Sequence, residues 1–264
     1  MSLQIGYAKN EEQSKKDKRK GSIYIYWGWN RSLYTNSDIH FNGTNYNFIL
    51  ENVVATDRQT RFDPKIYFHP LKITIPQVNY RIGYCIGEKY DISIGVDHMK
   101  YVVKTKQDVS ITGEIKNSGT SYDGIYNNDN IKIENGFLQF EHTDGLNYIN
   151  LEYKRFDNIL TYKEISLNLT EGIGIGILIP KTNSKLLQNK RNDQYYLAGY
   201  GCSSVFAINI SYKNCFIQTE VKGGFITMPN IRTTENQTDR ASQSFYFSQL
   251  NFLIGTTINL IKKK

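Results

Sequence analysis

The sequence lacks any apolar stretch that approaches the ~18 residues needed for a transmembrane helix. Of its 264 residues only five are proline, whereas 20 are tyrosine, a balance that favours β-strands over helical bundles. A closed β-barrel crosses a membrane without such a helix because neighbouring strands satisfy each other's backbone groups. The absence of a long apolar run therefore excludes a transmembrane helix, and both membrane barrels and soluble all-β folds stay possible. The length suits one barrel or sandwich, or two small domains.

Cysteine is also scarce, and its spacing carries no metal or redox signature. The three cysteines are Cys85, Cys202 and Cys215, and the sequence contains no CxxC pair and no cysteine–histidine cluster. Cys202 and Cys215 fall near opposite ends of consecutive expected strands, too far apart for a disulfide. We therefore expect no metal site, no cofactor and no disulfide.

The net charge of +7 is confined to the ends of the chain. Residues 9–20 carry six basic and three acidic groups, and Lys262, Lys263 and Lys264 add three more, which leaves 7 − 3 − 3 = +1 for the body. Solvated ends account for this distribution better than a nucleic-acid-binding patch does. We expect no nucleic-acid partner.

The first residues have the character of a processed leader. Leu3–Ala8 is apolar and small, and the charged residues that begin at Lys9 follow directly. This order is typical of the end of a signal peptide that is cleaved after Ala8. We therefore expect a leader with a charged periplasmic segment over 1–20 and one β-barrel domain over 21–264.

Several segments alternate apolar and polar residues with period two. In residues 165–179 the odd positions are isoleucine or leucine except at Glu171, and the even positions down to Gly176 are small or polar. One face of such a strand suits hydrocarbon and the other suits water. Because the minor face of most long strands is polar, the pattern favours a transmembrane barrel with a polar interior over a soluble sandwich or calyx.

The alternation predicts an all-β fold, an antiparallel up-and-down transmembrane β-barrel of eight strands. Long and short connections take turns, as in outer-membrane barrels with long outer loops, short periplasmic turns and both termini in the periplasm. Tyr46–Ala55 and Val109–Ile115 could join the wall, which would make ten strands. The eight expected strands are 22–34, 77–86, 90–103, 146–156, 164–179, 194–212, 215–228 and 244–261.

Four stretches resemble small outer-membrane β-barrel proteins of Gram-negative bacteria, with the architecture of the outer-membrane protein A and X type. They are YIYWGWNRS (24–32), IPQVNYRIGYCIGEKYDISIGVDHMKYV (75–102), LNLTEGIGIGILIPKT (167–182) and FIQTEVKGGFITM (216–228). The resemblance implies a porin-like protein of the bacterial outer membrane and no particular reaction. Such barrels usually end on an aromatic residue, whereas this chain ends on Leu260-Ile261 and three lysines.

Strand parity places a set of charged side chains in the interior. Matching faces across the turn at 87–89 pairs Asn79 with Asp97 and Arg81 with Gly95, so Arg81 and Asp97 become diagonal neighbours. These charges either plug the lumen and fix the strand register or line a ligand pocket or narrow conduit. The predicted polar network of the lumen consists of Arg81, Asp91, Asp97, Glu152, Lys154, Glu220 and Lys222.

The sequence offers no set of catalytic residues. His98 has outward parity near the loop end of its strand, where a lipid-modifying enzyme would hold a base, but no serine stands two positions away. His40, His69 and His142 fall in expected loops. The glycine alternation at 172–176 is not a dinucleotide fingerprint, because no strand-to-helix switch follows it. His98 therefore remains a weak candidate on the lipid face.

The long connections at 35–76 and 104–145 exceed what strand linking requires. We therefore expect a monomeric barrel with a structural or surface-binding role. Its partners would be outer-membrane lipids and lipopolysaccharide, together with a surface ligand or protein that these loops hold. A lipid A acyl-modifying enzyme and a narrow pore for small solutes are the alternatives.

Overall fold

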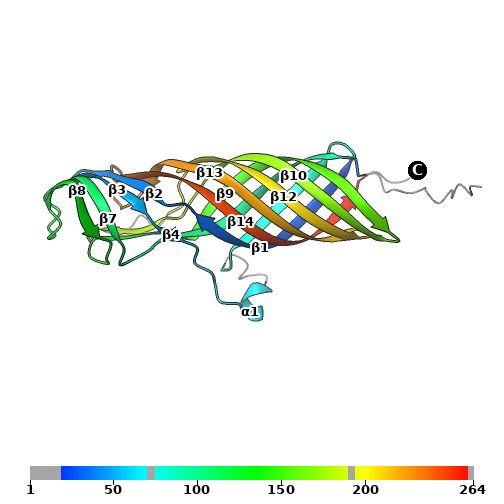
Figure 1. The fold of residues 1–264 in the computed structure, drawn as a ribbon, viewed down its shortest axis with the longest axis horizontal. Coiled ribbons are helices and arrows are strands. Elements are labelled where there is room, and N and C mark those ends of the chain that lie inside the picture. The colour runs from blue at the N-terminus through cyan, green and yellow to red at the C-terminus, as the bar shows by residue number, and fades with distance from the viewer. Residues whose placement is uncertain (1–18, 70–74, 190–193, 261–264) are drawn as a thin grey trace, which may run out of the picture.

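The computed structural model describes residues 19–69, 75–189 and 194–260 of the chain. They form 14 β-strands and one short α-helix (Figure 1). Eight of the strands make a closed antiparallel wall in which the first strand pairs with the last. The wall strands, in order around the ring, are β1 (Ser22–Tyr34), β5 (Val78–Cys85), β6 (Tyr90–Val103), β9 (Leu138–Tyr162), β10 (Ile165–Leu178), β12 (Gly199–Tyr212), β13 (Cys215–Arg232) and β14 (Arg240–Asn259).

This ring confirms the predicted eight-stranded up-and-down β-barrel. The expected bounds of β1 and β6 agree with the structure at both ends, because their alternation is regular and a turn or loop of polar residues stops each one. β9 is much longer than expected, since it runs from the barrel wall far into the region beyond it. The predicted register is also confirmed: Asn79 pairs with Asp97 and Arg81 with Gly95.

The ring closes with a stagger of ten residues. A path through hydrogen-bonded partners leaves β1 at Ile23 and returns to it at Leu33, and 33 − 23 = 10. A staggered ring of eight strands is tilted by roughly 45°, so each residue advances about 2.4 Å along the barrel axis. The path runs through Ile23, Tyr84, Ile92, Tyr153, Ile173, Ser204, Gly223, Ser248 and Leu33.

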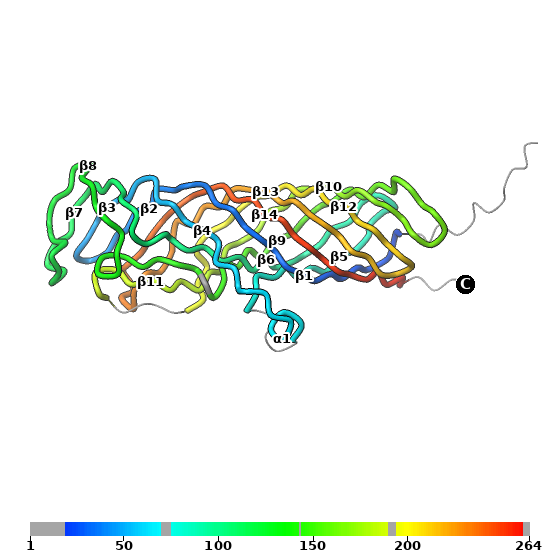
Figure 2. The backbone as a smooth tube through the Cα atoms, turned by 60° about the horizontal axis from the view of Figure 1, so that its bottom comes forward, coloured from blue at the N-terminus to red at the C-terminus, as the bar shows by residue number. Residues whose placement is uncertain are grey.

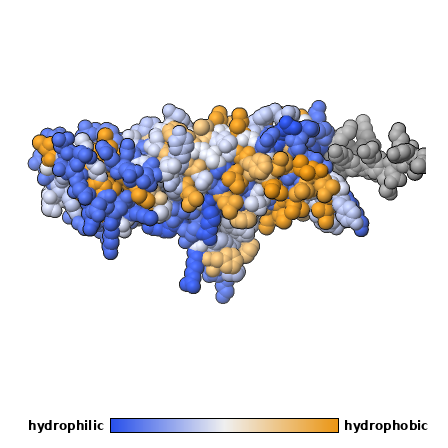
Figure 3. All heavy atoms as spheres, in the orientation of Figure 1, coloured by the Kyte–Doolittle hydropathy of each residue, from blue (hydrophilic) through white to orange (hydrophobic). Residues whose placement is uncertain are grey.

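The outer face of the wall is an apolar band. Outward residues such as Ile173 and Ile175 are each 67% exposed, whereas their inward neighbours are small or polar. Figure 3 shows hydrophobic side chains gathered on the half of the molecule that carries the tight turns. Exposed tyrosines lie near the edges of this band, among them Tyr84, Tyr90 and Tyr212 at the turn end and Tyr200 and Tyr246 at the other end.

A second body of strands extends the barrel at the end opposite the turns, and we call it the cap. Its sheet joins the wall at β14 and runs through β2 (Ser37–Gly43), β3 (Tyr46–Val53), β7 (Asp108–Ile115) and β8 (Gly124–Lys132). β4 (Ala55–Thr56) pairs with β6, and β11 (Asn183–Leu186) pairs with β9. Figure 2 shows these strands continuing the barrel along its axis.

The two segments that could have made a ten-stranded wall belong to the cap instead. Tyr46–Ala55 contains β3 and the first residue of β4, and Val109–Ile115 lies within β7. Their inward side chains enclose an apolar core rather than a polar lumen, with Phe48, Leu50 and Ile111 fully buried. The alternative of ten wall strands is therefore wrong: the same alternation that builds a wall also builds the cap.

A side flap, residues 57–69, leans against the outside of the wall and contains α1 (Pro64–Tyr67). Asp63 caps this helix by accepting a hydrogen bond from the Lys65 backbone N–H at 2.9 Å. Trp29 of β1 packs on the flap, with ring centroids 6.0 Å from Tyr67 and 5.4 Å from Phe68. In Figure 1 the helix stands off the side of the barrel.

Among the described residues, no helix has the length and apolar character needed to cross a membrane.

Candidate functional site

The structure brings the seven predicted charged residues together inside the barrel. Each of them is at most 3% exposed, and each projects from a wall strand. Arg81 comes from β5, Asp91 and Asp97 from β6, Glu152 and Lys154 from β9, and Glu220 and Lys222 from β13.

Lys222 and Arg81 hold two carboxylates at the centre of this network. The ammonium of Lys222 lies 2.6 Å from Asp97 Oδ2 and 2.7 Å from Glu152 Oε1. The Arg81 guanidinium lies 2.9 Å from the same Glu152 oxygen and 3.8 Å from Asp97 Oδ1. Asn150 completes the cluster by accepting from Arg81 at 2.6 Å and donating to Asp97 at 3.0 Å. In such an arrangement the attraction between opposite charges offsets the free-energy cost of removing them from water.

The remaining charges extend the network toward the turn end. Lys154 lies 3.4 Å from Glu152 Oε2 and over the rings of Tyr24 and Tyr26, at 5.1 and 5.4 Å from their centroids. Tyr24 donates a hydrogen bond of 2.7 Å to Asp91, and Arg19 forms an ion pair with the same carboxylate.

Glu220 is held by amides rather than by a close cation. Asn251 and Gln218 donate to its two oxygens at 2.8 and 3.0 Å, and Lys222 is 3.9 Å away. The amide chain continues from Gln218 through Asn209 to Asn168. Inward amides therefore link the central ion cluster to the polar side chains of the other wall strands.

With Arg19 included, the network contains four cations and four carboxylates. The seven predicted residues alone leave one negative charge in excess, and Arg19 balances it through Asp91. Arg19 falls in the segment expected to be the leader, because it precedes the first strand and has no partner by parity. Lys18 and the residues before it lie outside the described part of the chain, so the expected signal-peptide remnant lies outside it as well.

The lumen is filled from the charge network up to the cap. Above Lys222 the inward side chains of β9 and β14 become apolar, beginning with Tyr148 and Phe247, whose rings are 6.1 Å apart. Tyr148 and Phe247 belong to the same apolar core as the cap residues. Along the barrel axis, a polar plug made by the charge network is therefore followed by an apolar plug made by the core of the cap.

His98 does not occupy the lipid-exposed position expected for it. The side chain is only 7% exposed, and its Nδ1 lies 2.7 Å from Asn147 Oδ1 on the neighbouring strand. Gly145 lies beside the imidazole, so this histidine is enclosed where the wall passes into the cap. His142, expected in a loop, is buried in the cap and lies 3.0 Å from Thr182 Oγ1.

The three cysteines are free, and Cys85 alone is buried. Among the described residues, no group of three or more histidine, cysteine, aspartate and glutamate side chains has a geometry suited to a metal ion.

No family model and no curated protein matches this sequence. Solved structures do match. The chain is similar to the outer membrane protein AlkL in lipid bilayers, at 9% identity and a TM-score of 0.43, over 95% of this chain and 96% of that one. It is also similar to OprG from Pseudomonas aeruginosa, at 7% identity and a TM-score of 0.41, over 90% and 97% of the two chains. Ail of Yersinia pestis matches at 8% identity and a TM-score of 0.26, over 89% and 99%.

These structures are outer-membrane β-barrels, and the sequence resemblance identified the same class. The likenesses are too distant to carry an argument about activity. The class follows from the molecule itself: a closed antiparallel ring of eight strands, apolar outside and charged inside, is the architecture of a transmembrane β-barrel.

Proposed function

We propose that this protein is an integral outer-membrane β-barrel that does not conduct and that presents its cap at the cell surface. The observation that carries the proposal is the double plug. Eight charged side chains fill the lumen within the wall, and the apolar core of the cap closes it above. A barrel closed in this way has a structural or surface-binding role.

The asymmetry of the two ends supports an orientation with both termini in the periplasm. The turns at 163–164 and 213–214 are tight, and Ser22 pairs with Asn259 at the same end. The cap contains the long connections at the opposite end. Outer-membrane barrels combine short periplasmic turns with long outer loops. The cap strands β2, β3, β7 and β8 would then face the exterior.

Conductance measurement in a planar lipid bilayer tests the plug. The wild-type protein should give no channel steps, because the buried side chains of the charge network and of the cap core occupy the lumen. A variant lacking Lys222 and Arg81, Lys222→Ser with Arg81→Ser, should give steps if the cap also opens. Regular single-channel steps from the wild-type protein would contradict the proposal and favour a narrow pore.

The side flap supports lipopolysaccharide as a partner at the outer leaflet. Phe62 and Phe68 are 64% and 59% exposed, although Trp29 and Tyr67 hold them against the wall. Exposed aromatic rings of this kind anchor barrels at the membrane interface. Three exposed cations, Arg31, Arg61 and Lys65, accompany these rings. Guanidinium and ammonium groups at this depth suit the phosphates of lipid A.

Co-purification of lipid A phosphate with the protein tests this partner. Arg61→Gln with Lys65→Gln should lower the retained lipid A by roughly fivefold, since two charge-assisted contacts are lost. Lys116→Gln with Lys132→Gln removes the same charge from the cap and should have little effect. If instead removal of the β7–β8 hairpin abolishes retention and the flap variant has none of this effect, the cap holds the lipopolysaccharide.

The two alternatives draw less support from the geometry. A pore needs an open lumen, whereas the interior side chains here meet at hydrogen-bond distances. A lipid A acyl-modifying enzyme needs a base that reaches the lipid, whereas His98 is enclosed beside Asn147.

A further inference from the structure

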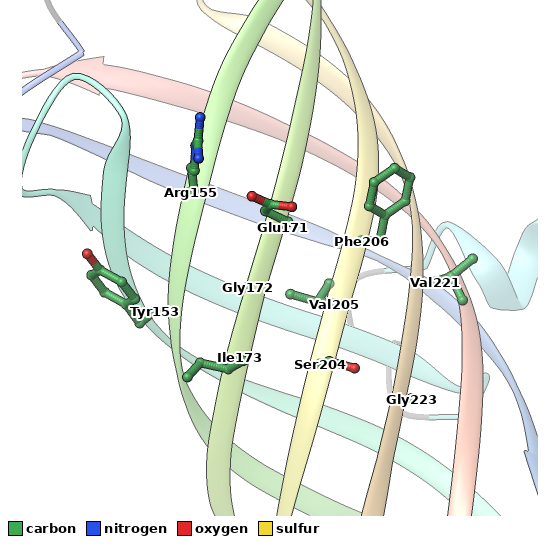
Figure 4. A pocket seen from close by; sticks show the side chains of 10 residues that line it. All are labelled: Tyr153, Arg155, Glu171, Gly172, Ile173, Ser204, Val205, Phe206, Val221 and Gly223. Atoms are coloured by element: carbon green, nitrogen blue, oxygen red, sulfur yellow. The ribbon is translucent and has the colours of Figure 1, made fainter.

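A groove of about 710 Å³ runs over the outside of the wall across β9, β10, β12 and β13. Figure 4 shows Arg155 and Glu171 side by side at one end of it, with Phe206 and Val221 on the two strands across. Tyr153, Ile173, Ser204 and Gly223 complete the outward-facing lining. The groove is therefore apolar along most of its length and charged at one end.

The groove exists because two small residues meet on the lipid-facing side. Ser204 of β12 and Gly223 of β13 are hydrogen-bonded partners, whereas the next outward pair toward the turns is the bulky Phe206 and Val221. A Cβ atom built on Gly223 has no neighbour closer than Phe247 O, at 3.8 Å. The hollow at Gly223 is thus open space, and a larger side chain fits there without displacing the wall.

Charged groups on a lipid-facing wall are unfavourable unless something pairs with them. Arg155 and Glu171 are direct cross-strand partners and both point outward. Asp157 forms an ion pair with Arg155, in which 2.7 Å separates Asp157 Oδ2 from Arg155 Nε. It forms a second ion pair with Lys89, at 3.0 Å. The Glu171 carboxylate forms no ion pair or hydrogen bond with any of the described residues. Glu171 is therefore an exposed anion beside an exposed cation on an apolar surface.

The charged end lies at the border of the apolar band. Tyr90, the first residue of β6, pairs with Arg155, and the turn residue Lys89 contacts Asp157. At about 2.4 Å of axial rise per residue, Arg155 and Glu171 lie within ~10 Å of this border. Long side chains at such a depth reach the headgroup level. The apolar remainder of the groove points toward the middle of the band.

We propose that this groove binds one phospholipid with a primary-ammonium headgroup, of the phosphatidylethanolamine kind, from the leaflet at the turn end. Its phosphate contacts Arg155 at Nη1, because Asp157 engages Nε and Nη2. Its ammonium donates to the Glu171 carboxylate, and one acyl chain lies over Ser204 and Gly223. The occupant follows from charge complementarity, because neighbouring cation and anion match a zwitterion. A phosphatidylglycerol headgroup would bring no cation for Glu171, and the quaternary ammonium of phosphatidylcholine has no N–H to donate. The inference rests on the proposed insertion of the barrel in the outer membrane.

Native mass spectrometry of the full chain, released from detergent with equal amounts of the three phospholipids, tests the site. The wild-type protein should retain phosphatidylethanolamine about fivefold better than the other two, and Glu171→Gln should remove this preference. Gly223→Leu fills the hollow and leaves every charge in place, and it should lower retention of all three lipids at this site.

Glu164→Gln is the matched control. Glu164 lies in the turn before β10 and pairs with Lys213 at 3.6 Å, outside the groove, so its loss should leave the preference unchanged. Equal retention of the three lipids by the wild-type protein would overturn the proposal, as would an unchanged preference in Glu171→Gln. A shift in gel mobility on boiling, measured for each variant, reports the closed barrel separately. Failure of the shift rejects the proposed function, whereas an intact shift without selectivity rejects only this site.

Discussion

Lys222 shows how closely the interior of this barrel is matched in charge. Its ammonium is fully buried and contacts Asp97 and Glu152, which come from two other wall strands. Removal of the lysine leaves Arg81 as the cation that both carboxylates share, at 2.9 Å from Glu152 and 3.8 Å from Asp97. The side chain therefore links three strands that backbone hydrogen bonds do not all join directly.

Replacement of Lys222 by methionine keeps most of the volume and removes the charge. We expect it to lower the free energy of unfolding by about 3–5 kcal/mol, as loss of one partner in a buried ion pair does. Denaturant unfolding of the detergent-solubilised barrel, followed by the boiling-dependent gel shift, measures this change.

Lys213→Met serves as the control, because Lys213 pairs with Glu164 on the surface and such pairs contribute at most about 1 kcal/mol. Addition of Glu152→Gln to Lys222→Met should cost less than the sum of the two single changes, since the two side chains are in contact. Strict additivity would show that they do not act as a pair.

Parity along the strands is enough to find seven of the eight charged residues of the lumen network. Each of these seven residues lies within a wall strand, where the period of two fixes whether its side chain points inward or outward. Arg19 could not be found in this way, because it precedes β1 and enters the lumen from the end of the barrel. His98 shows the opposite error: its parity is outward, yet the flanking Gly145 and Asn147 enclose it.

At the scale of elements, the cap depends on pairings that leave little mark on the sequence. β4 has two residues and β11 has four, too few for a recognisable period. β8 is largely polar and exposed, and Asn128 within it adopts a positive φ of 58°. The longer β2 and β3 alternate as wall strands do, so only the three-dimensional structure assigns them to the cap.

The cap should loosen in acid through His142. Burial lowers the pKa of this histidine to about 3 from its ordinary 6.5. Between these two values the unfolded segment binds more protons than the folded one, so stability falls as the pH drops from about 6.5 toward 3, by up to about 1.4 kcal/mol per pH unit. Hydrogen exchange over residues 138–146 and 183–186, measured between pH 7 and pH 4, reports the opening.

His142→Gln cannot titrate and should flatten this pH dependence, whereas His40→Gln, at a half-exposed position bonded to Asn47, should not. An equally steep dependence in His142→Gln would assign the acid opening to another group.

On the scale of the whole molecule, one set of strands has two different interiors. Along β9 the inward residues change from Glu152 and Asn150 to Tyr148 and Leu146, and along β14 they change from Asn251 to Phe245. This change from polar to apolar inward residues can be seen in the sequence. The period of two, however, shows only whether a side chain points inward or outward, and not whether the residue belongs to the wall or to the cap. The ring, its strand number and the polar lumen could be predicted; the folded cap could not.

β14 is shared by both bodies, and this has a consequence for assembly. It pairs with β13 and β1 to close the ring and with β2 to carry the cap sheet. Asn42 of β2 pairs with Arg240 of β14, and 240 − 42 = 198 positions of the chain separate these two residues. Contacts between such distant segments form late. Ring closure and completion of the surface structure therefore belong to one late event, and a nascent barrel that has not received its last strand cannot yet display a finished exterior.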